Sequence, residues 1–103
     1  MNKLSLIICT VNRITEPINL INSLEKQSIK DFNVVIVDQN KNDNLKDKII
    51  NKYPSLKIKY IHDFKLKGLS TARNKAILEN YSDYLAFPDD DCTYSSNFIE
   101  KIL

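Results

Sequence analysis

Two short apolar runs near the N-terminus place the strongest constraint on how this chain can fold. Residues 4–9 and 32–37 consist mostly of β-branched and other apolar side chains, and each run ends in polar residues. Runs of this length and composition are typical of strands that are buried on both faces, as in a parallel sheet covered by helices. We therefore expect both runs to be covered strands, with residues 4–9 at the centre of the sheet.

Helical and strand patterns alternate along the rest of the chain. Apolar residues recur at helical spacing in residues 14–24, for which Thr15 is the expected N-cap. The same spacing in residues 45–53 ends before Pro54, which stops a helix. Residues 56–61 alternate apolar and polar side chains, which is typical of an edge strand with one face exposed. Residues 69–77 and 98–103 predict two further helices, and residues 84–87 predict a fourth strand.

The alternation of strands and helices predicts a single α/β domain of residues 1–103. A mostly parallel sheet with helices on both faces, joined by right-handed crossovers, gives a three-layer α/β/α, Rossmann-like architecture. Ligands bind such sheets at the carboxyl ends of the strands, where the strand order reverses. With the strand order 3-2-1-4, the loops after the first, second and fourth strands line one rim. That rim would carry Thr10, Asn12, Arg13, Asp38, Asp89, Asp90 and Asp91.

Three consecutive carboxylates, Asp89, Asp90 and Asp91, follow the fourth predicted strand. They repel one another unless a positive charge lies among them. If the chain stays extended past Pro88, Asp89 and Asp91 project to one side and Asp90 to the other. Carboxylate oxygens are the ligands that Mg²⁺ and Mn²⁺ prefer, so the triplet is a candidate metal site. An exposed acidic loop, or a cap for the following helix, is the open alternative.

The chain has a single glycine, Gly68, which excludes two common phosphate-binding motifs. The GxGxxG loop of dinucleotide-binding folds and the P-loop both need more than one glycine, because the backbone must approach the phosphates closely. Phosphates would then have to be held by a carboxylate-bound metal, with Arg73 or nearby lysines assisting. The net charge of +2 is too small to indicate nucleic-acid binding.

Cysteine usage and hydropathy indicate the compartment. Cys9 and Cys92 lie far apart and form no CxxC or zinc-binding spacing, so a reduced, intracellular protein is the default. No apolar run approaches the about 20 residues that span a membrane, and we expect a cytoplasmic location. Both cysteines are interpreted as packing residues, and His62 as a loop residue without a chemical role.

Four segments resemble, in order and spacing, the motifs of the family 2 glycosyltransferases of the GT-A fold. They are Leu-Ile-Ile-Cys-Thr-Val-Asn-Arg at residues 6–13, Val-Ile-Val-Asp at 35–38, Gly-Leu-Ser-Thr-Ala-Arg-Asn at 68–74 and Phe-Pro-Asp-Asp-Asp at 87–91. The last segment corresponds to the family's DxD element. Each motif alone is weak, but four motifs in register across nearly the whole chain are specific.

The resemblance implies a site for a nucleotide-diphospho-sugar, most often a UDP-sugar. Thr10, Asn12 and Arg13 would pass beside the nucleoside. Asp38 would accept a hydrogen bond from the uracil ring, and Arg73 would reach the base or the diphosphate. The duller alternatives are that Asp38 caps the following turn and that Arg73 is a solvated helix residue.

The resemblance also implies a role for each residue of the acidic triplet. Asp91 would be the principal ligand of Mn²⁺ or Mg²⁺, Asp90 would lie toward the ribose or the metal, and Asp89 would be a further ligand. The metal would neutralise the diphosphate leaving group as a Lewis acid and template. Two departures leave the donor open: Gln39 stands where the family commonly has a second aspartate, and Val11 replaces a frequent tyrosine.

For the whole protein, the family resemblance implies an inverting, metal-dependent transfer of a sugar to a glycan or lipid-linked acceptor. Such a reaction would serve polysaccharide or cell-surface glycan synthesis. The catalytic base, usually an Asp or Glu, would lie beyond Leu103. We expect residues 1–103 to be the N-terminal donor-binding part, truncated within an amphipathic pattern and inactive alone. Exposed Phe98, Ile99, Ile102 and Leu103, or an unpaired sheet edge beside the fourth strand, would favour self-association. The full-length protein would associate peripherally with the cytoplasmic face of a membrane.

Two other functional classes stay open. A non-catalytic α/β binding module would keep the fold while its acidic loop is merely exposed to solvent. A nucleotidyltransferase-like domain shares the sheet and the acidic metal chemistry, but it usually begins with a glycine-rich motif after the first strand, and this chain has no glycine there. Binding of a nucleotide sugar or a divalent ion separates the first alternative from the transferase.

Overall fold

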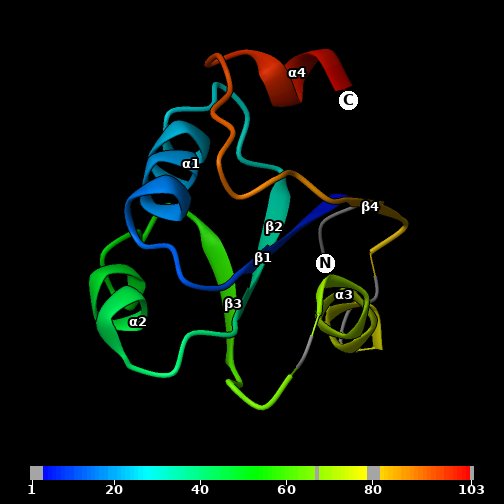
Figure 1. The fold of residues 1–103 in the computed structure, drawn as a ribbon. Coiled ribbons are helices and arrows are strands. Elements are labelled where there is room, and N and C mark those ends of the chain that lie inside the picture. The colour runs from blue at the N-terminus through cyan, green and yellow to red at the C-terminus, as the bar shows by residue number, and fades with distance from the viewer. Residues whose placement is uncertain (1–3, 67, 79–81, 103) are drawn as a thin grey trace.

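The computed structural model describes residues 4–66, 68–78 and 82–102, whose arrangement is shown in Figure 1. Strands and helices alternate along the chain, as the sequence patterns predict. The elements are β1 (Leu4–Thr10), α1 (Thr15–Glu25), β2 (Phe32–Asp38), α2 (Asn44–Ile49), β3 (Lys57–His62), α3 (Leu69–Leu78), β4 (Tyr84–Ala86) and α4 (Phe98–Ile102).

The strands of the described residues form one parallel sheet in the order β3-β2-β1-β4, which confirms the predicted order 3-2-1-4. β1 and β2 pair over their full length, so Thr10 lies beside Asp38 at the carboxyl end. Asp38 in turn lies beside His62, the last residue of β3. β4 pairs only with the first part of β1 and ends beside Leu6. The chain therefore leaves β4 before β1 ends, and the next segment can approach the carboxyl end of β1.

Alternating side chains of the strands face two separate apolar layers. Leu6 and Ile8 point to the side covered by α1 and α2, where the larger cluster also includes a residue of α4. Ile7 points to the other side, where Ala72 and Ala76 of α3 pack against the sheet. Figure 1 shows α1 and α2 on one side of the sheet and α3 on the other. The predicted three-layer α/β/α architecture is confirmed.

α2 ends at Ile49, earlier than the apolar spacing that continues to Tyr53 predicts. Asn51 has a φ of 62°, and asparagine is one of the few residues besides glycine that take this left-handed conformation, which commonly terminates helices. Tyr53 still packs against the core from the loop, and its hydroxyl donates to Asn22 Oδ1 on α1 at 2.7 Å. The apolar spacing continues past the end of the helix because Tyr53, in the loop that follows, packs against the same core cluster as Leu45 and Ile49.

Three smaller boundaries also differ from the sequence expectations. Thr15 is the first residue of α1 rather than its N-cap, and Ile14 at the N-cap position makes no side-chain capping bond. β3 extends to His62, and β4 ends before Phe87. Phe87 leaves the sheet because Pro88 follows it and has no N–H with which to continue a strand ladder.

Gln27, buried just after α1, anchors the C-terminal segment to the fold. Its side-chain nitrogen donates to the carbonyl oxygens of Ser23 at 3.1 Å and Ser95 at 2.7 Å. Its side-chain oxygen accepts a hydrogen bond from the backbone N–H of Ile99 at 3.0 Å. The side chain of Ile99 is fully buried. The expectation that Ile99 is exposed is therefore wrong, because a buried glutamine draws this segment onto the core.

Other apolar side chains of the C-terminal segment are only partly covered. Phe98 is half-buried, and its ring stacks on Tyr94 with a centroid distance of 4.0 Å. Ile102 is exposed, and Leu103 lies outside the described residues. Within the described sheet, β4 has β1 as its only neighbour, and self-association stays a prediction. None of the described helices is long and apolar enough to cross a membrane.

Gln27→Ala should destabilise the fold and release the C-terminal segment. The change removes three hydrogen bonds and leaves the buried Ile99 N–H unpaired, which should lower the free energy of unfolding by about 2 to 4 kcal/mol. Urea unfolding measures this loss, and hydrogen exchange of the Ile99 amide should become faster. Lys26→Ala, at an exposed neighbour, should stay within about 0.5 kcal/mol of wild type. An unchanged exchange rate at Ile99 would contradict the anchoring role.

Candidate functional site

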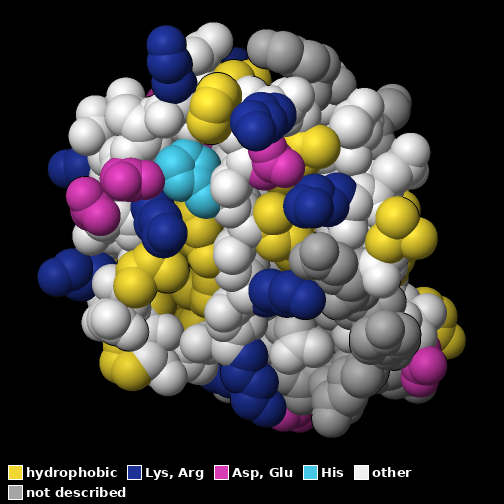
Figure 2. Space-filling model, turned by 90° about the horizontal axis from the view of Figure 1, so that it is seen from below, with side chains coloured by type: hydrophobic (Ala, Val, Ile, Leu, Met, Phe, Trp, Pro, Cys, Tyr) yellow, Lys and Arg dark blue, Asp and Glu magenta, His cyan; other side chains and the backbone are white. Residues whose placement is uncertain are grey.

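Polar side chains from neighbouring strands meet at the carboxyl end of the sheet. Thr10, Asp38 and His62 end β1, β2 and β3 and lie side by side in the strand register. Figure 2 views this end of the molecule, where the chain's single histidine lies among acidic and basic side chains. The loop after β4 reaches the same end, because Arg13 from the loop after β1 contacts Asp90. The three loops that were predicted to share one rim therefore meet there.

Asp38 is completely buried and is held by hydrogen bonds from its own loop and from β3. Its Oδ1 accepts a hydrogen bond from the backbone N–H of Asn40 at 2.8 Å, and its Oδ2 accepts one from the Tyr60 hydroxyl. His62 Nε2 lies 3.8 Å from Oδ2. Burial and the hydrogen bond to Asp38 raise the pKa of the Tyr60 hydroxyl far above its usual range, so this hydroxyl stays protonated and donates. Asp38 thus caps the turn after β2 and is enclosed by protein groups.

Asn40, in the loop after β2, contacts both the loop after β1 and the end of β3. Its side-chain oxygen accepts a hydrogen bond from the backbone N–H of Asn12, and its side-chain nitrogen donates to Arg13 O at 3.3 Å. Its own carbonyl oxygen lies 2.8 Å from His62 Nε2. The other ring nitrogen of His62, Nδ1, lies 3.2 Å from Asp43 Oδ1. Asn12 takes a left-handed conformation with φ of 59°, which the two bonds from Asn40 help to hold.

The local sequence pattern predicts no chemical role for His62 and does not identify Asn40 as a link between loops. The one signal for Asn40 is that it is an amide residue in the turn after a strand, where asparagine commonly bonds to nearby backbone. That signal cannot name a partner that lies in another loop. Only the parallel pairing of the strands brings Asn40 beside Asn12 and His62.

Gln39 points toward α3 and holds the loop that precedes this helix. Its side-chain nitrogen lies 3.3 Å from both Leu66 O and Gly68 O and donates to them. Gly68 has a φ of 84°, a conformation that residues with a side chain rarely adopt, so the single glycine is used at the start of α3. The residue that departs from the family pattern therefore has a structural contact of its own.

Arg13 supplies positive charge to the acidic triplet. Its Nη1 lies 2.9 Å from Asp90 Oδ1 and 3.5 Å from Asp91 Oδ2. The side chain of Asp90 is 15% exposed, whereas those of Arg13 and Asp91 are 42% and 55% exposed. The sequence predicts that these carboxylates need a cation among them, and a guanidinium group meets part of that need.

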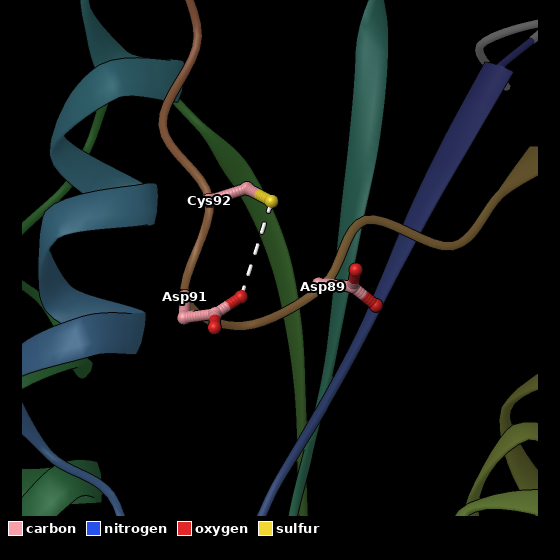
Figure 3. A group of neighbouring side chains, drawn as sticks. All are labelled: Asp89, Asp91 and Cys92. Carbon is pink, nitrogen blue, oxygen red and sulfur yellow. Dashed lines mark hydrogen bonds between the residues drawn. The ribbon is translucent and has the colours of Figure 1, made fainter.

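Asp89, Asp91 and Cys92 form the candidate metal group of the loop after β4. One ligand atom from each lies within 4.8 Å of the others, and a dashed line in Figure 3 marks the contact of the Cys92 sulfur with Asp91 Oδ1 at 3.9 Å. Two carboxylates suit a hard cation such as Mg²⁺ or Mn²⁺, which keeps further positions for water or phosphate oxygens. The two carboxylates therefore fit the predicted metal, whereas the Cys92 sulfur is a soft ligand that suits Zn²⁺ better than Mg²⁺ or Mn²⁺.

The backbone of this loop is not extended, in contrast to the geometry that the alternation argument assumed. Asp90 and Asp91 lie in a turn, and the Cys92 N–H donates to Asp89 O at 3.2 Å. The proline at position 88 ends the strand ladder, and aspartates favour turns. Asp89 and Asp91 come together through the turn rather than through strand alternation.

Arg73 and Asp90 approach the end of β1 from different elements. The guanidinium carbon of Arg73, on α3, lies 5.1 Å from the centre of the Phe87 ring. Burial raises the pKa of the Cys9 thiol, with Arg73 lowering it and Asp90 raising it further. Arg73 is engaged with an aromatic ring in this structure, and is not simply solvated.

Thr10 is the predicted site residue with an unfilled hydrogen-bonding group. The residue is 2% exposed, and its Oγ1 is buried without a hydrogen-bond partner among the residues that the structure describes. Buried hydroxyl groups are almost always hydrogen-bonded, so each exception calls for an explanation such as a ligand or a water molecule. Thr10 ends the central strand beside Asp38.

Known glycosyltransferases resemble this chain in sequence and in fold. An uncharacterized glycosyltransferase of Rickettsia conorii is 34% identical over 98 residues, which are 95% of this chain and 16% of the relative. S. aureus TarS 1–349 in complex with UDP-GlcNAc matches with a TM-score of 0.81 and 28% identity, over 97% of this chain and 30% of that chain. The chain thus spans a minor part of the length of both proteins.

A further solved structure supports the fold. The mannosyltransferase PcManGT of Pyrobaculum calidifontis, in complex with GDP-Man and Mn²⁺, has a TM-score of 0.80 at 18% identity, over 89% of this chain and 28% of that chain. Residues 5–103, nearly the whole sequence, match the sequence pattern of the family described as Glycosyl transferase family 2. The chain, with its parallel sheet and its acidic loop after β4, belongs to glycosyl transferase family 2.

Proposed function

We propose that this chain is the donor-binding part of a glycosyltransferase and binds a nucleotide-diphospho-sugar at the carboxyl end of its sheet. The observation that carries the proposal is the meeting of loops there, with the acidic loop of Asp89 to Asp91 held by Arg13 beside the end of β1. Membership in family 2 and the likeness to TarS in complex with UDP-GlcNAc support a UDP-sugar as the donor.

The nucleoside is proposed to lie against Thr10, Asn12 and Asp38. A polar group of the donor near Thr10 Oγ1 would give this buried hydroxyl the partner that it lacks among the described residues. Asp38 already accepts two hydrogen bonds, but a carboxylate has about four acceptor sites and can also accept one from the uracil ring. Because Asp38 is completely buried, this contact requires the rim loops to shift outward as the base enters.

The diphosphate is proposed to lie over the acidic loop. Asp91 and Asp89 would hold Mn²⁺ or Mg²⁺, with Asp90 toward the ribose or the metal. The metal, when bound, supplies Lewis-acid neutralisation of the diphosphate leaving group. Arg13 and Arg73 offer guanidinium groups that can pair with phosphate oxygens through two parallel hydrogen bonds.

The transfer step needs one more group than these residues supply. An inverting displacement requires a base that deprotonates the acceptor hydroxyl, and we assign this role to none of the described residues. The acceptor is proposed to be a glycan or a lipid-linked glycan. The chain described here would hold the donor and its leaving group for that reaction.

Titration with UDP in the presence and absence of Mn²⁺ tests the proposed site. We expect UDP to bind at least about tenfold more tightly with Mn²⁺ than with EDTA, because the metal bridges the carboxylates and the diphosphate. Asp91→Asn should abolish this metal dependence, since it removes one carboxylate of the proposed pair. Asp83→Asn, a matched loss of charge at an exposed position before β4, should leave it unchanged. A UDP affinity that changes neither with Mn²⁺ nor with Asp91→Asn would refute the proposal.

Thr10→Val separates a ligand contact from a structural role. Valine has the shape of threonine without the hydroxyl, and Thr10 Oγ1 has no partner within the described part of the protein. The melting temperature should therefore hold or rise, because removing an unsatisfied buried hydroxyl saves about 1 kcal/mol or more. UDP affinity, measured by calorimetry, should fall about three- to tenfold if the donor fills this position. An unchanged UDP affinity would show that the donor does not use the hydroxyl.

A further inference from the structure

We infer that Arg13 is an internal counter-ion that weakens divalent metal binding by the acidic loop until a nucleotide diphosphate is present. The inference rests on the proposed function, because it concerns the same acidic loop and the same donor. It adds an order to the binding events: the metal binds weakly to the free protein and tightly to the protein that holds the nucleotide.

The contacts of Asp91 place the guanidinium group and the candidate metal position on one carboxylate. Arg13 Nη1 lies 3.5 Å from Asp91 Oδ2, while Asp91 Oδ1 is the oxygen that faces the Cys92 sulfur. Asp91 also belongs to the group whose ligand atoms lie within 4.8 Å of one another. A cation bound to Asp91 would therefore share this carboxylate with a positive charge. The same nitrogen of Arg13 is closer still to Asp90 Oδ1, at 2.9 Å.

The backbone around Arg13 is held in a conformation that directs the side chain to this loop. The amide side chain of Asn40 bonds to the N–H of Asn12 and to the carbonyl oxygen of Arg13. Asn12 has the left-handed φ of 59°. Asn40 is itself bonded through its N–H to the buried Asp38. The backbone of Arg13 is thus held to the end of β2 through Asn40, and the Arg13 side chain starts from a fixed position when it contacts Asp90.

The tip of the Arg13 side chain is free to change partners. The side chain is 42% exposed and that of Asp91 is 55% exposed, and an exposed pair of this kind contributes little to stability. A diphosphate carries more negative charge than one carboxylate and can accept two parallel hydrogen bonds from a guanidinium group. Bound nucleotide would therefore draw Arg13 from Asp91, and the oxygens of Asp91 would become free for the metal.

The expected size of the effect follows from Coulomb's law. A divalent cation and a guanidinium group about 5 Å apart repel each other enough, even at the dielectric constant of water, to lower metal affinity on the order of tenfold. Removing the Arg13 charge should relieve this repulsion. In the wild-type protein, bound nucleotide strengthens metal binding, and by linkage bound metal strengthens nucleotide binding by the same factor.

The test measures Mn²⁺ binding directly, from the electron paramagnetic resonance signal of free Mn²⁺, with and without UDP. In the absence of UDP, Arg13→Gln should bind Mn²⁺ on the order of tenfold more tightly than wild type. Arg13→Lys keeps the charge and should stay close to wild type. Lys46→Gln removes a charge from an exposed position on α2 and should change the affinity by less than about twofold. UDP should enhance Mn²⁺ binding less in Arg13→Gln than in wild type.

The outcomes distinguish this inference from the proposed function. Equal Mn²⁺ affinities of wild type and Arg13→Gln without UDP, together with tight Mn²⁺ binding when UDP is present, would overturn the counter-ion role and leave the donor site standing. Failure of both proteins to bind Mn²⁺ even with UDP would overturn the proposed function and the inference with it. Circular dichroism of each variant checks that the fold is intact, and we expect it to match wild type because the side chains of Arg13 and Asp91 are both exposed.

Discussion

The parallel pairing of β1 with β2 is the constraint on which the rest of the structure depends. The two strands pair along their whole length, and their side chains supply both apolar layers of the core. A shift by one residue would exchange the two faces of a strand, so the register is strongly specified by packing. That register sets Thr10 beside Asp38 at the carboxyl end. The loops that carry Arg13 and Asn40 leave the sheet from these two positions.

Amide side chains, rather than a glycine-rich loop, shape the rim above the sheet. Asn40 bonds to the loop after β1, and Gln39 bonds to the loop before α3. An amide offers both a donor and an acceptor, so one side chain can satisfy two backbone groups of a neighbouring loop. Charge then completes the site, because Arg13 lies against the carboxylates of the loop after β4. The proposed metal and diphosphate chemistry depends on this balance between a guanidinium group and three adjacent aspartates.

The predictions from sequence succeeded where a local pattern has a single physical meaning. Apolar runs, helical spacing and the order of elements were enough for the parallel sheet with order 3-2-1-4 and for the rim where its loops meet. They failed where the partner is distant, because the burial of Ile99 depends on Gln27. They also failed where a backbone conformation is not encoded in the apolar spacing, since α2 ends early beside the left-handed Asn51. The contacts of Asn40 with Asn12, Arg13 and His62 were likewise absent from any local pattern. The predicted ligand contacts of Thr10, Asp38 and Asp91 stay proposals.

The sequence by itself determined the type and order of the strands and helices and which polar residues stand near the strand ends. Those properties follow from side-chain hydrophobicity and spacing, which act over a few residues. Only the tertiary structure decided that Asp38 is enclosed by Asn40 and Tyr60, and that Arg13 faces Asp90 and Asp91. These contacts join positions far apart in the chain, and they exist because the strand register and the loop conformations bring the groups within hydrogen-bonding distance. Spacing along a sequence carries no information about that distance.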